Sequence, residues 1–103
     1  MSTTLVQFDF PFDGPWGAGM SAALDGLARD IAAEEGLIWK IWTENQSERR
    51  AGGIYLFTSA EAAARYRRKH EERLAAFGIT DILARMFDVN SDLSAITRAP
   101  LSS

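Results

Sequence analysis

Cysteine is absent from this chain of 103 residues, and other residues that typically mark a reactive site are scarce. Without cysteine the chain forms no disulfide, no thiolate zinc site and no cysteine nucleophile. It also has a single histidine, His70, which argues against a dedicated transition-metal site. We therefore expect no metal, and any chemistry has to depend on other side chains.

Long hydrophobic runs and a strong charge of one sign are also missing. No apolar segment approaches the roughly 20 residues of a membrane helix, and the start Met1–Thr4 does not resemble a signal peptide. We therefore expect a cytoplasmic protein without a membrane partner. The net charge of -3 gives no general attraction to nucleic acid. The basic stretch from Arg65 to Arg73 contains glutamates as well, which favours an ion-paired, solvated helix face.

Aromatic and aliphatic residues are plentiful. The chain is 47% hydrophobic and 24% charged, which is typical of a globular domain, and it contains six Phe, three Trp and two Tyr. Its length suits one domain. Because no linker, repeat or low-complexity tract interrupts it, we expect a single domain over residues 1–103.

The first third of the chain predicts a strand and then a helix. Leu5–Phe10 alternates apolar and polar residues, as a half-buried strand does, and Pro11 should end its regular pairing. The turn Gly14–Gly17 leads into a predicted helix, whose apolar stripe runs from Trp16 to Ile31. Gly36 is predicted to cap the end of this helix.

The rest of the chain predicts a Trp-rich hairpin, a helix, a strand and a short C-terminal turn. Both strands of the hairpin are rich in β-branched and aromatic residues. Ser59 and Asn90 precede helical patterns and are predicted N-caps. The predicted segments are a strand over Leu37–Glu44, a turn over Asn45–Arg50, a strand over Gly53–Thr58, a helix over Ala60–Phe77 and a strand over Ile82–Val89.

This β-α-β-β-α-β order is the ferredoxin-like pattern of an α+β fold, with helices on one face of an antiparallel sheet. Trp39 and Trp42 lie three residues apart on one predicted strand, so their side chains point to opposite faces. The face without helices would therefore carry large aromatics in water, which usually marks an interface. We expect that face to pack on a second copy of the chain, forming a homodimer.

Several segments resemble the YdhR-type putative mono-oxygenase family. The specific part is Gly36–Glu44, with its two tryptophans, followed by Ala51–Phe57, with its Ala-Gly-Gly start. Phe12–Pro15 and Lys69–Leu74 fit as well, as does Phe87–Ser94. The resemblance covers essentially the whole chain, from about Leu5 to Ala99.

The resemblance implies a dimeric α+β barrel in which two ferredoxin-like sheets face each other. It also implies likeness to small mono-oxygenases that oxidise aromatic or quinol-like substrates with O2 and without flavin, haem or metal. We therefore expect no cofactor. The alternatives are a non-catalytic protein of the same barrel type that binds a hydrophobic ligand, and a structural role without a ligand, because fold does not fix function.

Aromatic side chains are the candidates for substrate binding. Trp39, Trp42, Tyr55 and Phe8 are predicted to wall an apolar pocket between sheet and helices, and Trp16 to lie under the sheet or at the pocket mouth. For each of them, a place in the core or the dimer interface is the alternative.

A substrate that gives its own electrons to O2 is a better donor after it loses a proton, so a general base is required. His70 is the first candidate, because an unperturbed histidine titrates near neutral pH. Its setting between Lys69 and Glu71 favours instead a solvated helix residue. Glu44 is a second candidate base, although ion pairs of Lys40 and Glu44 across a dimer interface are the preferred interpretation of those two charges.

Overall fold

The computed structural model describes residues 3–102. Within these residues every strand pairs antiparallel, and the sheet order is β2-β3-β1-β4. The elements are β1 (Thr4–Pro11), α1 (Ala18–Ala23), α2 (Asp25–Ala32), β2 (Leu37–Asn45), β3 (Arg50–Phe57), α3 (Ala60–Ala76), β4 (Leu83–Asp88) and α4 (Ser91–Ile96).

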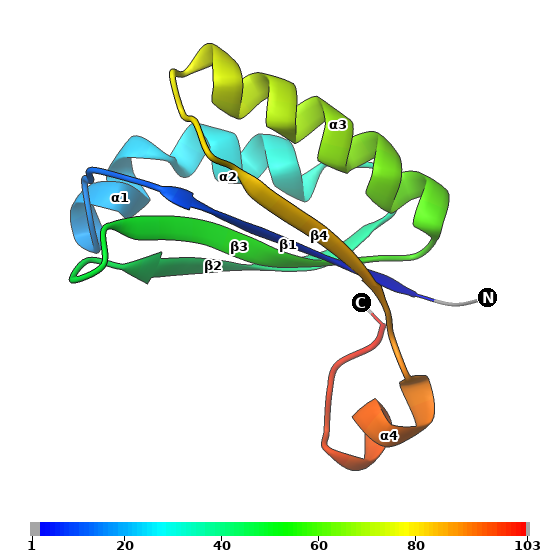
Figure 1. Ribbon diagram of the computed structural model, residues 1–103. Coiled ribbons are helices and arrows are strands. Elements are labelled where there is room, and N and C mark those ends of the chain that lie inside the picture. Colours follow the sequence, from blue (N-terminus) through cyan, green and yellow to red (C-terminus); the bar gives the residue numbers. More distant parts are fainter. Residues whose placement is uncertain (1–2, 103) are drawn as a thin grey trace.

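This order and sheet topology confirm the predicted ferredoxin-like α+β fold. In Figure 1, helices α1, α2 and α3 lie over one face of the sheet, whereas α4 and the C-terminal segment lie on the other side. The predicted caps are also confirmed: Ser59 accepts a hydrogen bond from the Ala62 amide, and Asn90 accepts one from the Leu93 amide. The last strand is one residue shorter at each end than predicted.

The predicted helix after the Gly14–Gly17 turn is wrong as one continuous element. It divides into α1 and α2 at Leu24, whose backbone leaves helical geometry (φ -105°, ψ 12°). In α1 only Met20 is buried, so few contacts keep this turn in line with α2. Gly36 does not cap the helix, which ends at Ala32. Its left-handed φ of 86° and its contact with α3, where an added Cβ would lie 2.5 Å from Ala62 Cβ, explain the glycine.

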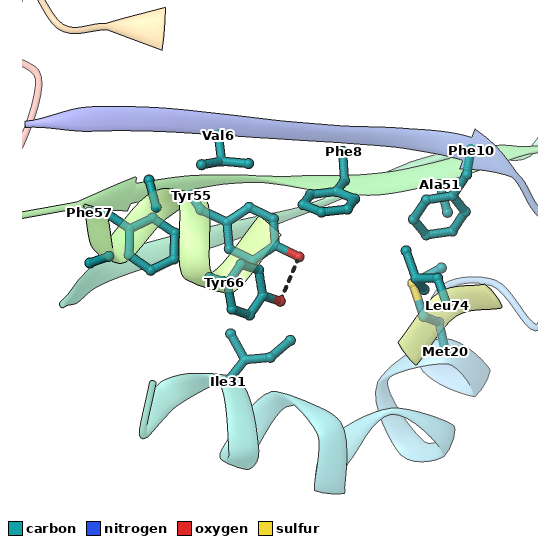
Figure 2. Close-up of a cluster of buried hydrophobic side chains, with 12 residues drawn as sticks. Val6, Phe8, Phe10, Met20, Ile31, Ala51, Tyr55, Phe57, Tyr66 and Leu74 are labelled. Carbon is teal, nitrogen blue, oxygen red and sulfur yellow. Dashed lines mark hydrogen bonds between the residues drawn. The ribbon is translucent and has the colours of Figure 1, made fainter. Parts of the chain in front are cut away.

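The core lies between the sheet and the helices. Val6, Phe8 and Phe10 alternate along β1 and are 0%, 1% and 7% exposed, because their face of the strand points toward the helices. Figure 2 shows them above Tyr66 of α3 and Ile31 of α2. Burial of such side chains is the main favourable term in folding.

The opposite face of the sheet is partly covered by the chain itself. Trp39 points to this side, and its Nε1 donates a 2.7 Å hydrogen bond to the carbonyl oxygen of Pro100. Its register partner on β3, Leu56, is 1% exposed. Farther along this face, Ile41 and Phe87 remain 55% and 46% exposed. Trp42 instead packs against the core on the helix side, so the prediction that Trp39 and Trp42 face opposite ways is confirmed.

Candidate functional site

A cavity of about 440 Å³ lies between the sheet and the three helices on its covered face. We call it the sheet–helix cavity. Its walls are mostly apolar, and its size and lining suit a small organic ligand. The polar groups that line it include Lys40, Tyr55 and His70, whereas no carboxylate from the described part of the chain, residues 3–102, lines it. The apolar wall includes Phe10, Phe12, Met20, Leu24, Leu27 and Trp42.

The strand register explains why these side chains meet. Lys40 and Trp42 alternate with outward-facing residues on β2, and they pair with Tyr55 and Gly53 of β3 on the helix side of the sheet. His70 approaches from α3, one helical turn after the buried Tyr66. Side chains from β2, β3 and α3 therefore line the cavity, and these three elements pack around the same core.

Lys40 crosses the sheet surface over a glycine. An added Cβ at Gly53 would lie 2.6 Å from Lys40 Cε and 3.1 Å from the Ile41 carbonyl oxygen, so only glycine leaves room for this side chain. Lys40 Nζ lies 3.2 Å from the centroid of the Trp42 ring and 4.6 Å from that of Tyr55. Burial, with a smaller contribution from the nearby Arg73 charge, lowers the pKa of Lys40 to about 7.

His70 is buried rather than solvated, so that expectation is wrong: only 2% of the residue is exposed. Its ring stacks on Tyr66 and meets Phe8 edge to face. Arg73 approaches His70 Nδ1 through Nε at 3.1 Å and Nη2 at 2.9 Å. Because a guanidinium only donates, Nδ1 accepts, and the neutral ring carries its proton on Nε2. Burial, then the charges of Lys40 and Arg73, lowers the pKa of His70 to about 3.

The two tyrosines connect the helix to the sheet. The Tyr66 hydroxyl donates to the Tyr55 hydroxyl at 3.2 Å, as Figure 2 shows. Arg73 extends the network to α2, because its Nη2 donates to the Tyr66 hydroxyl at 3.5 Å and its Nη1 forms a 2.8 Å ion pair with Asp30. Burial raises the pKa of both tyrosines, that of Tyr66 to about 12. Both phenols are therefore protonated throughout the physiological range and act as neutral hydrogen-bonding groups.

The structure brings three of the predicted site residues, Trp42, Tyr55 and His70, to the sheet–helix cavity. Phe8 does not line it, but it packs edge-on against His70 and Tyr55 behind the wall. Trp16 packs edge-on against Phe12, which does line the cavity.

Two other predicted site residues lie away from the cavity. Trp39 is on the opposite face of the sheet, where its indole bonds to Pro100. Glu44 faces the helix side but outside the cavity lining, and its Oε1 accepts a 2.9 Å hydrogen bond from the Gly17 amide. It thereby ties the loop before α1 to the edge strand.

Lys40 is the cavity residue that the sequence interpretation placed elsewhere. The expectation that it forms an ion pair across a dimer interface is wrong, because its side chain lies beneath the helices. Its position in the sequence could have indicated this role, because Lys40 shares a strand face with Trp42. The neighbouring strand also carries Ala51-Gly52-Gly53 near its start, which leaves space beside the lysine.

The basic stretch of α3 forms the predicted ion-paired face. Arg67 pairs with Glu71 within the helix, and Lys69 Nζ pairs with Glu34 Oε1 at 2.8 Å. Within residues 3–102 no three His, Cys, Asp or Glu side chains gather as a metal site would need. In the same part of the chain, no helix has the length and apolar character to cross a bilayer.

A family model described as putative mono-oxygenase ydhR matches residues 5–100. The chain belongs to the ydhR family. The family's description supports a mono-oxygenase-like function, with a small molecule and O2 as reactants. No curated protein matches this ydhR family member.

A solved structure with a similar fold is NE2512, a protein of unknown function from Nitrosomonas europaea. It is 14% identical, and the alignment covers 87% of this chain and 91% of that one, with a TM-score of 0.59. At this identity the likeness concerns the fold alone.

Proposed function

We propose that this protein is a mono-oxygenase that oxidises a small flat aromatic or quinol-like molecule, held in the sheet–helix cavity, with O2. The observation that carries the proposal is the composition of the cavity: an apolar space of about 440 Å³ whose lining also holds Lys40, Tyr55 and His70. The aromatic wall suits a flat ring, and the few polar groups suit one orientation of it. Membership of the ydhR family supports the reaction class.

In the proposed reaction the substrate supplies every electron, so no flavin, haem or metal takes part. A phenol with hydrogen on the carbon opposite its hydroxyl reacts with O2 to give a quinone and water. One oxygen atom enters the ring at that carbon, and the other leaves as water with the two hydrogens that the phenol loses. In this scheme His70 does not act as the base, because Arg73 occupies its Nδ1. The neutral His70 ring instead donates a hydrogen bond to the substrate through Nε2.

The second candidate is a non-catalytic protein that binds a hydrophobic ligand in the same cavity. One observation favours it: His70, the group expected to act as base, has one ring nitrogen engaged by Arg73 and a pKa lowered to about 3. A ring that resists protonation to this extent does not hold a substrate proton at neutral pH.

The proposal includes a cytoplasmic homodimer that pairs through the face of the sheet opposite the helices. Ile41, Leu83 and Phe87 are 55%, 49% and 46% exposed on this face. Exposed apolar side chains gathered on one face usually mark an interaction surface. A two-fold contact would cover the same residues on both copies.

Tryptophan fluorescence tests whether the cavity binds such molecules. A panel of flat phenols and hydroquinones should quench the protein, and Trp42→Phe should lose most of that change because Trp42 lines the cavity. Trp39→Phe is the matched control, since Trp39 lies on the opposite face of the sheet, and it should keep the response. Equal quenching in both variants would place the ligand outside the cavity and contradict the proposal.

Oxygen consumption with the same panel then separates catalysis from binding. In ¹⁸O2, the mono-oxygenase should place one labelled atom in the organic product and the other in water. Binding across the panel without oxygen uptake would exclude the mono-oxygenase and leave the binding protein. Uptake that yields hydrogen peroxide and an unlabelled product would identify an oxidase and also contradict the proposal.

A further inference from the structure

Among the residues that the structure describes, Lys40 is the only charged side chain that lines the sheet–helix cavity. Within residues 3–102, its ammonium group forms neither an ion pair nor a side-chain hydrogen bond with another residue. Its closest aromatic partners are the rings of Trp42 and Tyr55. Keeping a lysine charged in an apolar space without an acidic partner costs free energy. A ligand that supplies the missing hydrogen bonds therefore gains affinity.

The groups around Lys40 come from every element packed against it. Trp42 is on its own strand, and Tyr55 follows on β3. From α3, the Arg73 charge repels an ammonium and the neutral His70 ring brings no compensating charge. From α1 and α2 the lining is apolar. This arrangement favours a neutral amine in the empty cavity and an ammonium once an anion arrives.

We propose that the sheet–helix cavity takes ligands with a weakly acidic hydroxyl, a phenol or an enol, and that Lys40 accepts the proton of that hydroxyl and then pairs with the oxyanion. The O–H bond of the ligand breaks, an N–H bond forms on Lys40 Nζ, and no electron moves in this step. The inference uses the cavity of the proposed function and names its substrate class and its base. The resulting phenolate or enolate is the electron-rich form that reacts with O2.

The rest of the cavity is consistent with this assignment. His70 lines the same space and, as a neutral ring protonated on Nε2, offers a second donor to an oxyanion. Tyr55 remains a protonated phenol beside the amine. A lysine pKa close to the working pH suits a general base, because both protonation states are then well populated.

The chain has only two lysines, Lys40 and Lys69, which makes the base directly observable. Protein with ¹³C-labelled lysine should give two lysine signals, and Lys40→Met should remove one of them, which assigns the Lys40 signal. We expect that signal to titrate near pH 7. Under nitrogen, 2-naphthol should raise the midpoint of Lys40 by about one unit or more, since an opposite charge favours the ammonium. Its methyl ether, 2-methoxynaphthalene, should not raise it.

Binding measured under nitrogen completes the test. Lys40→Met should lower the preference for 2-naphthol over its ether by roughly tenfold to a hundredfold, the effect of losing a charge-assisted hydrogen bond. Lys69→Met, which removes a lysine paired with Glu34 outside the cavity, should retain the full preference. Thermal melts of both variants check that the fold is intact.

A Lys40 midpoint near 10, an equal rise with the ether, or an unchanged preference in Lys40→Met would overturn the inference. These results do not depend on turnover. If the wild-type protein consumes oxygen and Lys40→Met keeps the same preference, the proposed mono-oxygenase function stands and Lys40 is excluded as its base. The expected midpoint shifts without oxygen uptake would leave Lys40 as an anion-binding group in a protein that binds ligands without catalysis.

Discussion

Replacing His70 by Asn should make the protein less sensitive to acid. The folded chain holds His70 neutral in a buried site, with a pKa of about 3, whereas the pKa of an unperturbed histidine is about 6.5. As pH falls below 6.5, the unfolded chain binds a proton that the folded chain refuses, so the free energy of unfolding decreases. The loss continues until the pH approaches 3. Asn retains an oxygen acceptor for Arg73 but does not titrate.

The magnitude follows from the two pKa values. One such group changes the free energy of unfolding by about 1.4 kcal/mol per pH unit once the pH is well below the unfolded value. Between pH 6 and pH 4 the wild-type protein should therefore lose about 2–3 kcal/mol more than the His70→Asn variant.

Urea unfolding, followed by tryptophan fluorescence at pH 6, 5 and 4, measures both proteins. At each pH the two free energies of unfolding are subtracted, so the effect of the carboxylates, which both proteins share, cancels. A constant difference at all three pH values would refute the reasoning, because it would mean that His70 accepts a proton in the folded state as readily as in the unfolded one.

Two further predictions concern the glycines of β3 and the exposed face of the sheet. Gly53→Ala should displace the Lys40 side chain and weaken 2-naphthol binding at little cost in stability. In Gly52→Ala the added Cβ would overlap a carbonyl oxygen of β1, so chemical denaturation should show a free energy of unfolding lower by about 3 kcal/mol or more. Similar losses in the two alanine variants would contradict the assigned contacts. Phe87→Lys should convert a sedimenting dimer into a monomer, and Ala32→Lys on the helix layer should not; a wild-type monomer at micromolar concentration would refute the dimer.

The fold was predictable because each element carries a strong local pattern. The alternation from Leu5 to Phe10 and the aromatic hairpin fix which sides of the strands face the helices, and short connections leave few topologies. The break at Leu24 was not predictable, because the apolar stripe continues through it. Only the packed structure reveals that α1 has too few buried contacts to stay aligned with α2.

The candidate site was only partly predictable. The aromatic strand pattern named Trp42 and Tyr55 as candidate walls, and both line the cavity, but the same pattern did not separate them from Trp39. His70 was misjudged because the charges next to it in sequence suggested solvent. Its helical spacing pointed the other way, since Tyr66, His70 and Leu74 recur every four residues along one buried stripe. Lys40 required the register, because its role depends on a glycine in the neighbouring strand.

The hydrogen bond between Tyr66 of α3 and Tyr55 of β3 also determines the position of the helix on the sheet. Near its start, α3 meets the sheet through Ala62 and Ala63, small residues that fit many positions along a helix. A shift of α3 by one turn would keep much of that contact, but it would separate the Tyr66 and Tyr55 hydroxyls and leave the buried Tyr55 hydroxyl without its partner. The tyrosine pair thus destabilises shifted positions of α3 on the sheet more than it stabilises the native position. It thereby keeps His70 at the cavity instead of one turn away.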